Sequence, residues 1–355
     1  MNHHPPVSRR RLMTGALALV TLPAVPALAQ VAFPYYRGED ALQGLYAQHM
    51  PALARAFEAR ARALTAAVRE QCTQVEPAML LQVWRQTLQA WLALSAPAVG
   101  PVVTRRSQRQ IDFWPMRPPL LQKALDGQPR TLADMARVGT PAKGFPAMEA
   151  LLLAQAFDAR TCGYLTLVAE GIEAEASALR DAFDRLAAHD WTEDEEGART
   201  AFAEWINQWL GGLERLRWIE IEQPVQRART AGQGRPPVFA RRSMDDNLAA
   251  WRTQWQALRN QARLAPGQQD APPQPGRDLI PIEALLMGKG QMALAQRWAQ
   301  AIDSVDRALA TLPARPEGDE WMALSATMKK LTALYQQDIA SALDVPLGFS
   351  DTDGD

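Results

Sequence analysis

The clearest structural signal in the chain lies at residues 165–186, which read LTLVAEGIEAEASALRDAFDRL. Apolar side chains recur there in steps of three and four, the spacing that gathers them on one face of an α-helix. The members of this stripe are Leu165, Val168, Ile172, Ala176, Leu179, Phe183 and Leu186. The segment therefore predicts one long amphipathic helix.

The same periodicity extends over most of the chain, and no stretch alternates with the period of two that is typical of strands. We expect further helices at about 40–73, with a kink at Pro51, and at 78–96, 244–264, 290–310 and 319–343. Another helix should follow a capping box formed by Thr192 and Glu195. Segments 229–243 and 265–278 are rich in Pro, Gly and Gln and predict loops. The fold class is therefore all-α, with long antiparallel helices.

Tryptophans at helical spacing are expected in the core of these helices. They are Trp84, Trp91, Trp205, Trp209, Trp251, Trp255, Trp298 and Trp321.

The composition narrows the class of protein. Of 355 residues, 47% are hydrophobic and 22% are charged, as in an ordinary globular protein. Lys plus Arg number 38 against 39 Asp plus Glu, so there is no basic excess to bind a nucleic-acid backbone. Two cysteines are too few for a disulfide-rich miniprotein or a four-cysteine zinc module.

The first 29 residues have the pattern of a signal peptide. The basic run Arg9–Arg11 precedes an apolar run, and Ala27-Leu28-Ala29 forms a cleavage signal. We expect export to the periplasm with cleavage after Ala29. The segment 8–13 favours the twin-arginine route, and an ordinary Sec signal stays open. The apolar run is too short to span a membrane, and no later segment is long and apolar enough to do so.

Two short motifs occur twice in the same order. Trp84-Arg85-x-x-x-Gln89-Ala90 matches residues 251–257, and Glu149-Ala150-Leu151-Leu152 matches residues 283–286. They predict two repeated antiparallel bundles in one large unit, related by a pseudo-two-fold axis: 30–228 and 229–355. The motif pairs are offset by 167 and 134 residues, so the first repeat holds about 33 additional residues, including IDFWPMRPP at 111–119.

The second motif begins in the stretch GFPAMEALL at 144–152. Gly144 permits a sharp turn, and Pro146 suits the first turn of a helix. Glu149 then lies on the flank of a buried helix, where a carboxylate pairs with Arg, caps backbone or binds a ligand. Its repeat mate, Glu283, would face it across a cleft and give an oxygen-rich site for Fe(III), Ca²⁺ or Mg²⁺, unless both glutamates only brace their helices.

Several segments together resemble the imelysin-like family, exported helical proteins once classed as M75 peptidases. Gly144-x-Pro146-x-x-Glu149 is similar to the family motif Gly-x-His-x-x-Glu, with Pro in place of His. The other similar segments are Ile111–Arg117, with its Phe-Trp-Pro…Arg pattern around Trp114 and Pro115, the region of His49 and Pro51, and the tail 346–355.

The resemblance implies a two-repeat periplasmic protein associated with iron-regulated uptake, whose cleft binds a metal or another small ligand. It implies iron ahead of zinc or calcium, and envelope or iron-transport proteins as partners. The ligand- or metal-binding candidates are His49, Arg117, Gly144, Glu149 and Glu283.

A catalytic role is less favoured than binding. Pro146 lacks the imidazole of the family motif, and no HExxH pattern occurs. We therefore expect a binding or accessory protein. A metallopeptidase of M75 type, a metal-free binder of a peptide or small organic anion through Arg117, and a partner-docking protein remain alternatives.

Cys72 and Cys162 are the only cysteines and would lie in an oxidising compartment. They predict one disulfide that closes a loop of about 90 residues and stabilises the fold by about 4 kcal/mol.

Overall fold

The apolar stripe that starts at Leu165 lies on helix α9 (Ala159–Ala187) of the computed structural model, and all its members except Leu186 are buried. The structure describes residues 1, 3, 33–71, 77–154, 158–232 and 235–348. Helix α9 packs antiparallel to α2 (Met50–Gln71), because Arg69 pairs with Glu170 at 2.6 Å and Arg55 pairs with Asp184 at 2.7 Å.

The first half of the chain forms two long helical segments and a group of short helices. A helix runs from Gly38 to Gln71 through α1 (Gly38–Gly44), the π-helical segment η1 (Leu45–His49) and α2, and α3 (Pro77–Ser95) follows. The short elements are α4 (Pro101–Thr104), α5 (Ser107–Ile111), α6 (Pro118–Asp126), α7 (Leu132–Ala136), the 3₁₀ turn η2 (Thr140–Ala142) and α8 (Gly144–Ala154).

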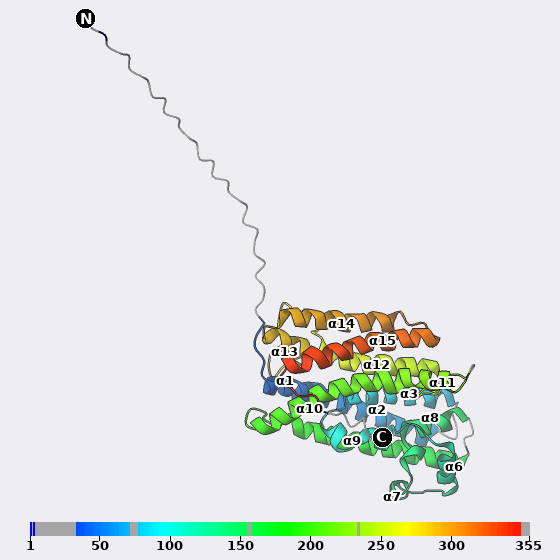
Figure 1. Cartoon of the computed structure of the whole chain (residues 1–355). Helices are drawn as coiled ribbons and strands as arrows, with labels where there is room; N and C mark the ends of the chain where they lie inside the picture. The colour runs from blue at the N-terminus through cyan, green and yellow to red at the C-terminus, as the bar shows by residue number, and fades with distance from the viewer. Residues whose placement is uncertain (2, 4–32, 72–76, 155–157, 233–234, 349–355) are drawn as a thin grey trace. The chain divides into compact units, whose positions relative to one another are not determined.

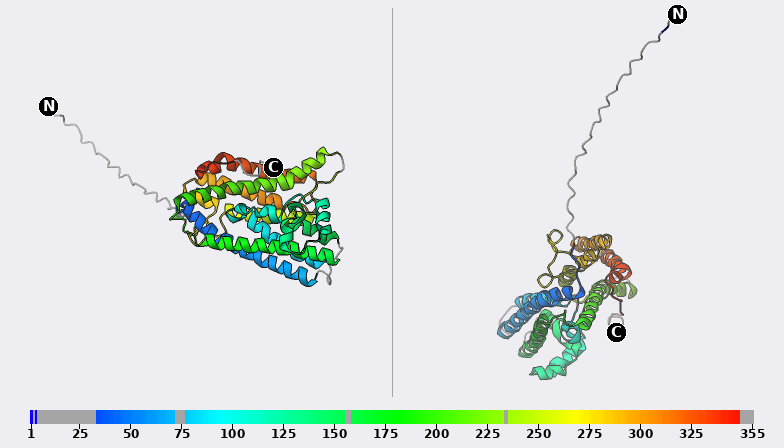
Figure 2. Two further views of the ribbon diagram at one scale, coloured as in Figure 1. Left: turned by 90° about the horizontal axis from the view of Figure 1, so that it is seen from below. Right: turned by 90° about the vertical axis from the view of Figure 1, so that its left-hand side faces the viewer.

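The second half consists of long helices joined by loops. They are α10 (Glu195–Glu214), the π-helical η3 (Arg215–Glu222), α11 (Gln223–Thr230), α12 (Met244–Ala262), α13 (Ile282–Gly288), α14 (Met292–Ala310), α15 (Gly318–Leu334), the π-helical η4 (Tyr335–Ile339) and α16 (Ala340–Ala342). From Phe33 onward the chain is one compact unit, in which the long helices lie alongside one another (Figures 1 and 2). The described residues contain no strand, and none of their helices meets the length and apolarity needed to cross a membrane.

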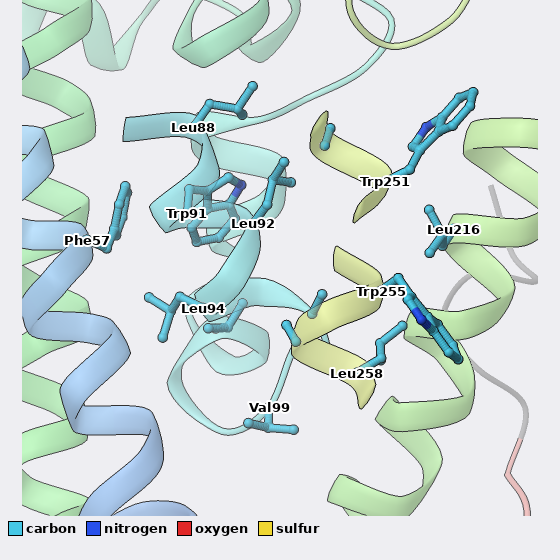
Figure 3. Close-up of a cluster of buried hydrophobic side chains, with 14 of the residues drawn as sticks. Phe57, Leu88, Trp91, Leu92, Leu94, Val99, Leu216, Trp251, Trp255 and Leu258 are labelled. Carbon is cyan, nitrogen blue, oxygen red and sulfur yellow. The ribbon is translucent and has the colours of Figure 1, made fainter. Parts of the chain in front are cut away.

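The centre of the core is the contact between α3 and α12. Figure 3 shows α3, with Trp91 and Leu92, next to α12, with Leu258, while Phe57 of α2 lies on one side and Leu216 of η3 on the other. All eight tryptophans predicted for the core are buried, none more than 8% exposed. The all-α prediction and the tryptophan prediction are confirmed. The subdivision into repeats 30–228 and 229–355 stays a prediction.

One predicted helix start is wrong. The N-cap of α10 is Asp194, whose carboxylate accepts the Gly197 N–H at 2.9 Å. Thr192 instead donates its hydroxyl to Asp190 at 2.7 Å. Asp is at least as good an N-cap as Thr, so Asp194 rather than Thr192 caps the helix and the loop ends there.

The predicted disulfide and signal peptide lie partly outside the described residues. Cys162 is buried near the start of α9, and Cys72 is not among the described residues. Of residues 1–29, only Met1 and His3 are described. Both the pairing and the cleavage after Ala29 stay predictions.

Candidate functional site

The segment that precedes α6 is held against the start of α8. Gly144 has φ +74°, and a Cβ there would lie 2.2 Å from the carbonyl oxygen of Ile111. Only glycine combines this left-handed backbone with so close an approach. A second tie is the Arg117 N–H, which donates to the Pro141 carbonyl at 3.1 Å. The sequence motif around Gly144 therefore positions residues 111–117 beside the helix that carries Glu149.

Glu149 is 2% exposed and links α8 to the segment before α12. Its Oε1 accepts the backbone N–H of Arg242 at 2.8 Å. Burial raises the pKa of this carboxyl; the Arg242 N–H and the charge of Arg241 favour the ionised form but do not offset the burial. Glu149 thus accepts a backbone hydrogen bond, which is one of the roles that the sequence analysis left open for it.

Next to Glu149 lies a buried ion pair that the sequence analysis did not find. Arg241 donates from Nη2 to both carboxylate oxygens of Asp112, each at 2.8 Å. The two side chains are 5% and 3% exposed. The indole of Trp91 donates to the same carboxylate at 3.2 Å. Asp112 therefore joins the segment 111–117 both to α3 and to the residues just before α12.

Arg241 has capacity for further hydrogen bonds. Its Nε and Nη1 are buried and have no partner among the described residues. Burial alone would lower its pKa, but the nearby carboxylates of Asp112, Glu220 and Glu149 outweigh it and hold the pKa above its ordinary value. The guanidinium is therefore charged, with two donor nitrogens left over within this part of the chain.

The backbone around Arg241 is fixed by side chains at the start of α12. Asn247 accepts the Arg241 N–H at 2.9 Å and donates to its carbonyl at 2.7 Å. Asp246 accepts from Ser243 Oγ at 2.6 Å and pairs with Arg85 of α3 at 2.6 Å. The site is preorganised, since each of these contacts restrains the segment 241–247.

Glu283 has a comparable role at the far end of α12. Both of its oxygens accept from Arg263 Nη1 at 2.7 Å, and one accepts the Leu264 N–H at 2.9 Å. The other two nitrogens of Arg263 bond to Asp303 at 3.3 Å. Arg263 therefore has a partner on every nitrogen, in contrast to Arg241.

The two glutamates of the repeated motif do not converge. Glu149 binds backbone just before α12 and Glu283 binds backbone just after it, and α12 has 19 residues. At 1.5 Å per residue the ends of α12 are about 28 Å apart. A single ligand shared by Glu149 and Glu283 is therefore not supported, because no pair of side chains bridges that length.

Among the described residues, the side chains of His49 and Arg117 form no hydrogen bond or ion pair with this network. His49 ends η1, and its Nε2 is buried with no partner among the described residues. Burial lowers the pKa of His49 to about 4, so it is neutral at pH 7. The Arg117 side chain is exposed. Within the described part of the chain, no hydrogen bond or ion pair connects either side chain to Glu149.

The remaining motif residues differ in burial. Pro146 is buried in the first turn of α8, Trp114 is half-buried and Pro115 is exposed.

The described residues do not fit a metal site. They contain no group of three His, Cys, Asp or Glu side chains close enough to hold an ion. The carboxylates of Asp112 and Glu283 are both occupied by arginine, and Glu149 bonds to backbone. The acidic residues of the tail, Asp351, Asp353 and Asp355, lie outside the described residues.

Comparison with known proteins agrees with this architecture. The family model described as Imelysin matches residues 49–344, which is most of the chain and spans both glutamate motifs. The chain belongs to the imelysin family. None of the curated proteins compared with it matches.

Two solved structures share the fold of this imelysin. An imelysin-like protein from Psychrobacter arcticum 273-4 is 17% identical, with a TM-score of 0.72 over 88% of this chain and 97% of that one. A predicted iron-regulated protein A precursor from Parabacteroides distasonis ATCC 8503 is 14% identical, with a TM-score of 0.69 over 86% of this chain and 95% of that one. At these identities the likeness concerns the fold.

Proposed function

We propose that this imelysin is an exported binding protein of iron-regulated uptake that catalyses no reaction. The signal-peptide pattern of residues 1–29 supports export. The name of the Parabacteroides protein supports the link to iron. Pro146, in place of a histidine ligand, and the arginine-bound carboxylates argue against an activated metal-bound water.

The observation that carries the proposal is the difference between Arg241 and Arg263. Arg263 is saturated by carboxylates, whereas Arg241 keeps two buried donor nitrogens, without a partner in the described chain, beside the family motif. Such donors suit a ligand that brings its own oxygen atoms. The proposal is that iron is recognised here as an organic chelate, whose oxygens would accept from Arg241 once the buried segment before α12 opens to admit it, rather than as a bare ion held by protein carboxylates.

The test compares ligands and matched arginine variants. Ferric citrate, citrate alone, Zn²⁺ and Ca²⁺ are titrated into the protein by equilibrium dialysis, with thermal unfolding followed in parallel. We expect ferric citrate to bind and to lose at least about tenfold in affinity in Arg241→Lys. Arg263→Lys is the control, because the same change there alters a saturated ion pair and should leave binding intact.

Other outcomes separate the alternatives. Binding of bare metal ions that is lost in Glu149→Gln would favour a metal site and contradict the chelate. Chelator-sensitive peptide hydrolysis would favour the metallopeptidase. If no ligand binds to either variant or to the wild type, Arg241 is a structural brace and the partner-docking alternative gains.

A further inference from the structure

A second candidate site lies on α6 and α7, away from the network around Arg241. These helices pack on α9 at the edge of the bundle (Figure 1). Both lie between the sequence motifs at 84–90 and 149–152. Between them is a hollow of about 480 Å³, within the range of about 300–1,000 Å³ typical of small-molecule sites. Its lining comes from α6, the turn after it, α7 and residues 138–142.

The lining combines apolar surface with unneutralised positive charge. The apolar contribution comes from Leu120, Ala124, Pro129, Val138 and Ala142. The charged contribution comes from Lys123, Arg130, Arg137 and Asp134.

Of these charged groups, Arg137 and Asp134 neutralise each other at 2.6 Å. Among the described residues, Lys123 and Arg130 pair with no carboxylate, and both line the hollow. Within that part of the chain, the net effect is two uncompensated cations beside an apolar wall.

Local contacts hold the hollow in shape. The Thr131–Asp134 capping box fixes the start of α7, and the Asp134 carboxylate also accepts the Arg130 N–H at 3.0 Å. Below it, the Tyr164 hydroxyl of α9 donates to the Ala142 carbonyl at 2.6 Å, in a buried position. A preformed hollow binds with less ordering of side chains and loops than a flexible one.

We propose that this hollow binds a small organic carboxylate with an apolar body. The apolar wall would accept an aromatic or alkyl group, and Lys123 and Arg130 would bind its carboxylate. Charge alone does not explain the lining, because five of its members present apolar surface. The site is independent of the one proposed at Arg241, since it shares no residue with it.

The test measures binding of stated probes by isothermal titration calorimetry. The carboxylates are 2-naphthoate, 3-phenylpropionate and octanoate. The comparison probes are 2-naphthylmethanol, which lacks the charge, and acetate and inorganic phosphate, which lack the apolar body. We expect at least one of the three carboxylates to saturate the protein, and the comparison probes to bind at least about tenfold more weakly.

Variants locate the binding. Lys123→Gln/Arg130→Gln should weaken carboxylate binding at least about tenfold, because two partly screened charges are lost. Arg252→Gln/Lys330→Gln removes the same charge from exposed residues outside the hollow and should leave the affinity unchanged. Ala124→Trp fills the hollow and should abolish binding, with thermal unfolding as the check that it folds. All four charge substitutions are on exposed side chains and should not affect folding. They therefore test whether the hollow binds the carboxylate even if Ala124→Trp does not fold.

Three results would overturn the proposal. The first is that none of the carboxylates saturates the protein. The second is that the neutral alcohol or phosphate binds as tightly as the best carboxylate. The third is that the control charge variant weakens binding as much as the Lys123/Arg130 variant.

Discussion

Gly144 shows how a single residue controls the placement of the site. Its left-handed φ and its contact with the Ile111 carbonyl hold residues 111–117 against α8. Asp112 follows Ile111 directly. A substitution at Gly144 that displaces Ile111 would therefore also displace Asp112 and its buried ion pair with Arg241.

Gly144→Ala should therefore destabilise the protein by at least about 1–3 kcal/mol, because a side chain at positive φ is strained and the Cβ would also clash with Ile111. Gly171→Ala is the matched control: Gly171 lies inside α9, and a Cβ there would meet no atom within 4 Å, so alanine should stabilise by about 0.5–1 kcal/mol. Urea unfolding measures both. Equal effects of the two substitutions would contradict the turn assigned to Gly144.

Glu149 predicts a pH dependence with a definite sign. Burial raises its folded pKa, so the neutral acid stabilises the fold at low pH, and this contribution is lost as pH rises through the folded pKa. Glu149→Gln stays neutral and can still accept the Arg242 N–H. Relative to wild type, the variant should therefore gain stability as pH rises from about 4 to about 7, measured by urea unfolding at each pH.

Glu283→Gln is the contrasting variant. It weakens the buried pair with Arg263, so at pH 7 it should be less stable than wild type. A Glu149→Gln variant with the same stability difference at all pH values would show that burial does not govern this carboxyl.

At the scale of elements, helical periodicity predicts well where a helix lies and less well where it begins. The long helices α3, α9, α12 and α14 lie close to their predicted ranges because each buries a continuous apolar stripe. The start of α10 lies two residues later than predicted, since both Thr192 and Asp194 are good N-caps and periodicity does not choose between them. Periodicity does not predict the π-helical segments, because they leave the apolar spacing nearly unchanged.

The N-cap of α10 can be tested directly. Asp194→Ala should destabilise the protein by about 1 kcal/mol, because it removes the acceptor of the Gly197 N–H. Thr192→Ala should cost less, since Thr192 bonds only to the exposed Asp190. Thermal unfolding measures the stability lost in each variant. A larger loss of stability in Thr192→Ala than in Asp194→Ala would support the capping box predicted from the sequence.

At the scale of the whole molecule, the candidate site depends on contacts that no local pattern contains. The motif with Gly144 and Glu149 is visible in the sequence, but its partners come from two distant segments, 111–119 and the predicted loop 229–243, whose meeting no sequence pattern predicts. Asp112 and Arg241 are 129 residues apart, and their pairing follows from the packing of α3 against α12. For the same reason the predicted approach of Glu283 to Glu149 fails: a repeat in sequence does not say at which end of α12 each motif lies.

The predicted disulfide would also link distant parts of the molecule, since Cys72 and Cys162 are 90 residues apart in the sequence. The ion pairs between α2 and α9 bring the end of α2 toward the start of α9, where Cys162 lies, which favours its pairing with Cys72. Reduction should lower the free energy of unfolding by about 4 kcal/mol in the chain-entropy model. Urea unfolding with and without a thiol reductant measures the loss, and Cys72→Ser/Cys162→Ser should not respond to the reductant. One free thiol per cysteine in the untreated protein would contradict the pairing.

Variants of the Asp112–Arg241 pair test whether the segment 111–117 is joined to the start of α12 through buried charge. Arg241→Met leaves the Asp112 carboxylate buried without its ion-pair partner, so it should destabilise the protein by about 3–5 kcal/mol. Asp112→Leu should destabilise it similarly, because the Arg241 guanidinium then stays buried without the Asp112 carboxylate. Asp112→Leu/Arg241→Met removes both charges of the pair. Its loss of unfolding free energy, measured with urea, should therefore be well below the sum of the two single losses. Additive losses would mean that the two charges are solvated independently and that the segment is held by Gly144 and apolar packing alone.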